Sequence, residues 1–108
     1  KARNMPLRAP MLIVVIASLK AHPKVPEGEQ LLAAGCAAHG LLLAAHAQGI
    51  GAVWRTGEFA YDLNVMKGLG LAEQERLLGF LYLGTPEGRV RSAPVLEPEA
   101  FVNGWNGQ

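Results

Sequence analysis

The chain has 108 residues, enough for a single domain, and half of them are hydrophobic, so a sizeable core can form. Only 18% are charged and the formal net charge is +1. The ten Lys and Arg are scattered along the chain, whereas a nucleic-acid-binding domain needs a concentrated basic surface. We therefore expect no nucleic-acid partner. Cys36 is the one cysteine, so no internal disulfide can form, and a reducing, cytoplasmic setting is predicted.

The first predicted elements are a strand and a long helix. Met11–Leu19 is rich in β-branched residues, follows Pro10 and is apolar on both faces, which is typical of a central strand. A helix is expected from Pro26 to about Gln48, with Gly49 ending it, and no side chain is well placed to cap its N-terminus.

This helix raises the question of a membrane span, since no residue from Leu31 to Trp54 is charged. The segment also carries glycines, two histidines and many alanines, so its hydropathy is weak for a span. A helix that is apolar all round can equally lie at the buried centre of a protein, where small residues allow close approach of another helix, within the subunit or across a two-fold axis. We therefore predict a core helix and no membrane partner, with a small membrane-associated protein as an open alternative.

Three shorter elements follow. Gly51–Arg55 is a predicted strand, Asp62 a predicted N-cap for a helix over Leu63–Leu69 that Gly70 closes, and Arg76–Leu83 another apolar strand. The order of strand, helix, strand, short helix and strand is typical of an α/β protein with a parallel sheet.

Residues 87–108 are predicted to be an extended C-terminal tail of a single, partial domain over residues 1–108. Phe101, Val102 and Trp105 are isolated apolar residues in that tail, which favours its packing against another surface. Two strands that are apolar on both faces need more cover than one long helix gives. We therefore expect a partner subunit or a preceding N-terminal segment to supply the rest.

Two groups of residues suggest chemistry. Cys36, His39 and His46 share one side of the helix, but the rise from the first to the last is roughly 15 Å, too far for one ion, so no metal site is predicted. Trp54, Arg55 and Thr56 stand at a strand end and offer a flat ring, a cationic fork and a hydroxyl, which suit an anionic aromatic ligand. The ordinary alternative places Trp54 in the core and Arg55 in solvent. No catalytic residue is identified.

Four segments, taken in order, resemble the short bacterial NAD(P)H nitroreductases of the flavin-dependent nitroreductase superfamily. They are Lys1–Pro10, Ala47–Gly51, Val53–Gly57 and Gly79–Pro86, of which the last is the most distinctive. The resemblance implies an α+β fold: a mostly antiparallel sheet flanked by helices, with the long central helix in the interface of a homodimer. This chain would be the C-terminal portion of that fold.

The resemblance also implies a cofactor and its site. FMN would be contacted by Trp54, Arg55 and Thr56, and NAD(P)H, the co-substrate, by the stretch Ala44, Ala45, His46, Ala47, Gln48 and Gly49. Arg89 or Arg91 could meet the flavin phosphate, although a solvated tail charge is the simpler reading of both. The Arg-Arg-Ser-type segment with which the family grips FMN is not in this sequence.

The implied activity is ping-pong hydride transfer from NAD(P)H through FMN to a small-molecule acceptor, a nitro compound or a quinone. Arg55 is placed to stabilise negative charge on the reduced flavin. The alternative from a different class is a catalytically incomplete dimerisation or interaction module derived from the same family.

Overall fold

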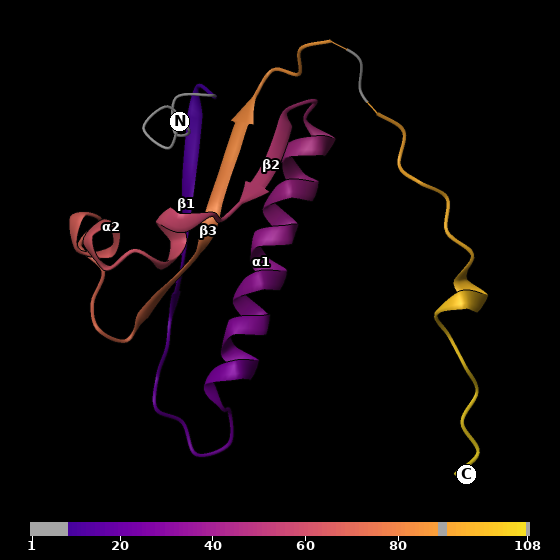
Figure 1. Ribbon diagram of the computed structural model, residues 1–108, viewed down its shortest axis with the longest axis horizontal. Helices are drawn as coiled ribbons and strands as arrows, with labels where there is room; N and C mark the ends of the chain where they lie inside the picture. The colour runs from indigo at the N-terminus through magenta and orange to yellow at the C-terminus, as the bar shows by residue number, and fades with distance from the viewer. Residues whose placement is uncertain (1–8, 89–90, 108) are drawn as a thin grey trace.

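The computed structural model describes residues 9–88 and 91–107, which form a three-stranded sheet between a long and a short helix, followed by a tail (Figure 1). The elements are β1 (Met11–Ser18), α1 (Glu27–Ala47), β2 (Gly51–Arg55), η2 (Glu58–Tyr61), α2 (Leu63–Gly68), β3 (Glu75–Gly84) and η3 (Pro98–Ala100). Each predicted strand and helix is confirmed, and its ends are shifted by one residue at most.

The sheet has the order β1-β3-β2, and both outer strands run antiparallel to β3. The parallel sheet expected from the order of elements is therefore wrong, and the antiparallel sheet implied by the family resemblance is confirmed. Strands β1 and β2 do run in the same direction, as strands joined through a helix commonly do. They are not neighbours, because β3, the last strand in the chain, lies between them and hydrogen-bonds to both.

The central strand of the described sheet is β3, and the prediction that Met11–Leu19 is central is wrong for the described residues. Phe80, Leu81 and Tyr82 of β3 are all buried, whereas Met11 on β1 is 57% exposed. Within the part of the chain that the structure describes, β1 is an edge strand with apolar side chains on both faces. The apolar pattern of β1 thus predicts that both of its faces are packed against other elements, and the described residues do not supply all of that packing.

The two faces of β3 pack against different helices. Phe80 and Tyr82 form a buried cluster with Leu77 on the α2 face, where Val65 and Met66 of α2 pack against it. Leu81 pairs with Trp54 across the sheet and so points to the other face, toward α1. The side chain of Leu81 is only 1% exposed, which makes it the best-buried large residue of the described chain.

Helix α1 packs on the sheet through its smallest residues. Ala38 is 0% and Ala45 4% exposed, while Leu32 and Leu43 on other sides of the helix are 72% and 58% exposed. The predicted position at the buried centre of a protein is therefore not reached with the described residues alone. By length and by a mean hydropathy of 1.3 the helix could cross a membrane, a weak indication that core helices and signal sequences also give.

Local hydrogen bonds explain where α1 begins and ends. Pro26 is the N-cap and offers no side-chain acceptor, as expected, and the Gln30 amide instead ties the preceding loop by donating to the carbonyls of Lys20 (2.8 Å) and Val25 (2.9 Å). At the other end Gly49 has a φ of +76°. The Gly49 and Ile50 amides donate back to the His46 and Ala45 carbonyls, the Schellman pattern that glycine permits.

Asp62 caps α2 as predicted, and its removal gives a first test of the fold. The carboxylate accepts from the Asn64 amide at 2.7 Å and the Val65 amide at 3.3 Å. Asp62→Ala should lower the free energy of unfolding by about 1 kcal/mol, because both amides lose their acceptor, whereas Asp62→Asn keeps an acceptor and should lose much less. Urea unfolding followed by circular dichroism measures both variants. Equal losses for alanine and asparagine would contradict the capping role.

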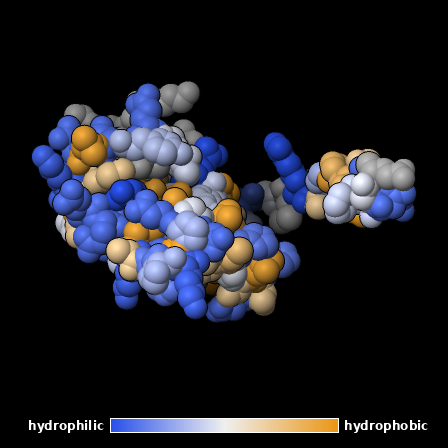
Figure 2. Space-filling view, turned by 90° about the horizontal axis from the view of Figure 1, so that it is seen from below, coloured by the Kyte–Doolittle hydropathy of each residue, from blue (hydrophilic) through white to orange (hydrophobic). Residues whose placement is uncertain are grey.

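Residues 91–107 run apart from the domain, as Figure 1 shows, and appear as a separate lobe in Figure 2. The radius of gyration is 17.5 Å, compared with about 13 Å for a compact domain of this length. The apolar side chains of this tail are exposed, and they are Val95, Leu96, Phe101, Val102 and Trp105. Phe101, Val102 and Trp105 are the residues from which packing of the tail against another surface is predicted, and that packing stays a prediction.

Candidate functional site

The end of β2 places Trp54 and Arg55 on opposite faces of the sheet. The Trp54 ring lies toward α1, where a β-carbon placed on Gly35 would be 3.9 Å from its Cη2 atom, and its Nε1 donates to the Leu78 carbonyl at 3.3 Å. Arg55 is exposed and points to the other face, since successive residues of a strand alternate. The side chains of Trp54 and Arg55 therefore cannot both meet a ligand on one face. A ligand that contacts both residues has to lie across the strand end.

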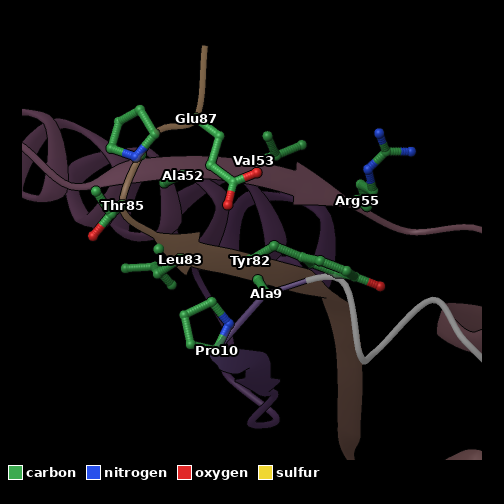
Figure 3. Close-up of a pocket in the computed structure, with 12 residues that line it drawn as sticks. Ala9, Pro10, Ala52, Val53, Arg55, Tyr82, Leu83, Thr85 and Glu87 are labelled. Carbon is green, nitrogen blue, oxygen red and sulfur yellow. The ribbon is translucent and has the colours of Figure 1, made fainter.

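A cavity of about 510 Å³ lies on the Arg55 face, within the size range of small-molecule sites (Figure 3). Its polar groups come from Arg55, Tyr82, Thr85 and Glu87. In Figure 3 the Glu87 carboxylate lies over β2 near Val53, and the Tyr82 hydroxyl points toward the Arg55 end. The whole lining is Ala9, Pro10, Gly51, Ala52, Val53, Arg55, Tyr82, Leu83, Gly84, Thr85, Pro86 and Glu87.

Glycines and prolines shape one end of this cavity. Gly51 and Gly84 pair across β2 and β3, and each faces a proline ring. A β-carbon on Gly84 would lie 2.8 Å from Pro10 Cδ, and one on Gly51 would lie 3.1 Å from Pro86 Cγ. A side chain at position 84 would therefore displace the Pro10 ring where the chain enters β1, whereas one at position 51 would need only a small shift of Pro86 where the chain leaves β3.

A second, more apolar cavity of about 520 Å³ lies on the α1 face and includes Trp54. Leu31, Leu32, Gly35, Cys36 and His39 line it from α1, and Leu78 from β3. Cys36 and His39 thus share this cavity, while His46 lies elsewhere on the helix. Residues 9–88 and 91–107 contain no group of three His, Cys, Asp or Glu side chains that could hold a metal ion.

The residues implied for NAD(P)H lie at the other end of β2. Ala44–Gly49 is the C-terminal end of α1 and leads through Ile50 into Gly51. Ala45 is buried and the other five residues are exposed. The span of β2 from Gly51 to Arg55 is about 13 Å, so this segment does not converge on the Trp54–Thr56 end. The residues implied for NAD(P)H and those implied for FMN therefore lie at opposite ends of β2.

The two arginines implied for the flavin phosphate lie in the tail. Arg89 is outside the described residues, and Arg91 is exposed beyond the end of β3. Sequence reasoning missed Tyr82, Glu87 and the proline–glycine corner of the cavity on the Arg55 face. The Gly79–Pro86 segment carries a signal for them, because its glycines and proline follow an apolar strand directly.

Fold and site together define an α+β domain with a ligand-sized cavity beside an antiparallel strand end. A sequence profile of the nitroreductase family matches residues 1–85, and the chain belongs to this family. It is 45% identical over 103 residues to the "Putative NAD(P)H nitroreductase YdjA" of Escherichia coli. The matched region covers 94% of this chain and 56% of that protein. It is 40% identical over 104 residues to a "Putative NAD(P)H nitroreductase" of Haemophilus influenzae, with the same coverage. The chain thus spans about half the length of these curated relatives.

Solved structures give the same result for the fold. A "putative nitroreductase" from Desulfovibrio desulfuricans, crystallised in complex with FMN, has a TM-score of 0.66 and 28% identity over 85% of this chain and 53% of its own. A nitroreductase-like protein from Bacillus cereus has a TM-score of 0.59 and 28% identity over 76% of this chain and 46% of its own. The nitroreductase-like α+β fold implied by the resemblance is therefore confirmed, as part of a longer fold.

The described residues suit one end of a flavin better than the other. A flavin ring is flat and largely apolar with hydrogen-bonding edges, and β2 offers it the Arg55 guanidinium and the apolar side chain of Val53, with Thr56 next in the chain. A phosphate needs several cationic or amide donors, but Arg55 is the only cationic residue lining the described cavity, and the carboxylate of Glu87 disfavours an anion beside it. The residues thus fit the ring of FMN and leave most of the grip on the phosphate to groups outside the described set.

Proposed function

We propose that this chain provides the ring-binding part of the FMN site in an NAD(P)H-dependent, nitroreductase-type oxidoreductase. The observation that carries the proposal is the position of Arg55, exposed at an open strand end beside a cavity of about 510 Å³. Family membership and the FMN bound by the Desulfovibrio desulfuricans relative support it. Bound FMN would supply hydride transfer from NAD(P)H to a small-molecule acceptor, a nitro compound or a quinone, in two separate half-reactions.

The residues of this chain would orient the ring and set the charge around it. Arg55 presents five N–H donors in a rigid fork, which suits the carbonyl edge of a ring and favours negative charge there. Thr56 adds a hydroxyl at the point where Gly57, with φ +69°, turns the chain away from the sheet. Val53, which is 49% exposed, and Leu83 add apolar surface to the lining of the cavity.

The proposal also includes a homodimer. Helix α1 leaves Leu32, Leu41 and Leu43 at 72%, 44% and 58% exposure, a large apolar area for a monomer of this size. A second copy that covers these side chains would bury them, and its residues could complete the flavin site. A cytoplasmic setting, in which the Cys36 thiol stays reduced, is part of the same proposal.

The test is the visible absorbance of the purified chain before and after excess FMN and gel filtration, with the elution volume recorded in the same run. We expect a retained flavin band in a fraction that elutes as a dimer, followed by oxidation of NADH or NADPH when a quinone is added. A dimer that retains no flavin would favour the alternative, an interaction module of the same family without catalysis. A folded monomer that retains no flavin would contradict both.

A further inference from the structure

We infer that Gly79 is a positioning residue that holds Trp54, and with it the Arg55–Thr56 end of β2, in the place from which that segment would meet the flavin. The expected effect on FMN binding rests on the proposed function. The placement of Trp54 by Gly79 rests on contacts between β2 and β3 alone. These contacts lie at a break in the regular pairing of the central strand.

The break is a β-bulge in β3. Val15 of β1 pairs with Gly79 and Ile16 with Leu77, so Leu78 is an extra residue with no partner in the register. The bulge turns the Leu78 carbonyl out of the ladder, where it accepts the Trp54 Nε1 hydrogen at 3.3 Å. An indole N–H in a partly buried place needs such an acceptor, and the bulge supplies it.

Gly79 itself provides the space. Its φ is +154°, a backbone conformation that side chains rarely allow. A β-carbon at this position would overlap with Trp54 Nε1, lie 2.8 Å from Trp54 Cδ1 and lie 2.9 Å from the Arg55 carbonyl oxygen. The indole therefore lies directly on the bare Gly79 backbone, and any side chain would push either the ring or the Arg55 peptide away.

This contact occurs where β2 leaves the sheet. Arg55 pairs with Phe80 and is the last paired residue of β2, so Gly79 stands opposite Thr56, the first residue beyond the ladder. The indole, fixed on one face by Gly79 and the Leu78 carbonyl, thus acts as an anchor for the strand end. Arg55, the next residue, is directed to the opposite face by the same geometry.

The experiment uses the Trp105→Phe chain as the parent, because Trp105 is 85% exposed and its removal leaves Trp54 as the one indole reporter. Gly79→Ala is compared with Gly70→Ala, a control whose φ is also positive (+76°) but whose added methyl would meet nothing within 4 Å. Trp54 emission and its quenching by acrylamide report the position of the indole without any flavin. Titration with FMN reports the consequence for the site.

We expect Gly79→Ala to shift Trp54 emission to longer wavelength, to increase quenching and to weaken FMN binding about tenfold, the loss expected when one or two hydrogen bonds are misaligned. Gly70→Ala should change neither readout. Unchanged Trp54 emission in Gly79→Ala would overturn the inference. An emission shift with FMN affinity unchanged would overturn the link to the cofactor.

A double-mutant comparison guards against a variant that fails to fold. Gly79→Ala should lower the urea midpoint more in the presence of Trp54 than in a Trp54→Val background, where the overlap with the indole is gone and only the contact with the Arg55 carbonyl oxygen remains. Equal losses in both backgrounds, or failure of both to fold, would assign the cost to the Gly79 backbone and the Arg55 carbonyl and not to the indole, and would overturn the positioning role. If the parent binds no FMN, the proposed function fails for this chain, while the emission and the double-mutant comparison still decide where Gly79 holds the indole.

Discussion

Leu81→Ala is expected to lower the free energy of unfolding by about 2–5 kcal/mol, the range for removing a fully buried leucine from a packed core. Leu81 is 1% exposed and sits at the centre of β3, paired with Ile13 on one side and Trp54 on the other. The cavity left behind would have the sheet on one side and α1 on the other, and neither can collapse freely. Small domains have little stability in reserve, so this variant should populate unfolded chain at ambient temperature.

Leu63→Ala is the matched control, because it deletes the same atoms from a side chain that is 72% exposed at the start of α2. Its effect should stay within about 0.5 kcal/mol. Urea unfolding followed by tryptophan fluorescence and circular dichroism measures both variants under identical conditions. Similar losses for the two leucines would mean that β3 is not the centre of the core.

Arg55→Gln is expected to weaken FMN binding about tenfold or more, since a charge-assisted hydrogen bond contributes roughly 1.5–3 kcal/mol. Glutamine keeps the approximate length of the side chain and removes the positive charge and the fork of donors. Lys67→Gln, which removes a charge from the exposed surface of α2, is the control and should leave binding unchanged. Fluorescence titration of FMN measures the three dissociation constants.

Riboflavin lacks the phosphate of FMN. Comparing the binding of riboflavin and FMN therefore shows whether an arginine contacts the flavin ring or the phosphate. If Arg55 meets the ring, Arg55→Gln should weaken riboflavin and FMN by the same factor. Arg91→Gln should weaken FMN alone if this tail arginine meets the phosphate. A loss confined to FMN in Arg55→Gln would move Arg55 to the phosphate and contradict the ring-binding role.

The candidate site was predictable in its residue types and less so in its geometry. Trp54, Arg55 and Thr56 stand at a strand end as expected. That Trp54 and Arg55 face opposite sides of the sheet follows from strand alternation and could have been read from the sequence. That Ala44–Gly49 lies at the far end of β2 also follows from the sequence, because this segment leads through Ile50 into Gly51. That Glu87 reaches over the cavity depends on how the chain folds back after β3, for which no local pattern exists.

The sequence by itself determined the elements and their ends. Asp62, Gly49 and Gly70 act on hydrogen bonds within a few residues of themselves, so their effect is the same in any fold. Only the tertiary structure decided that β3 lies between β1 and β2, and that Gly79 lies under the Trp54 ring. These contacts join residues more than twenty positions apart, and they are selected by the burial of whole faces, which no short stretch of sequence contains.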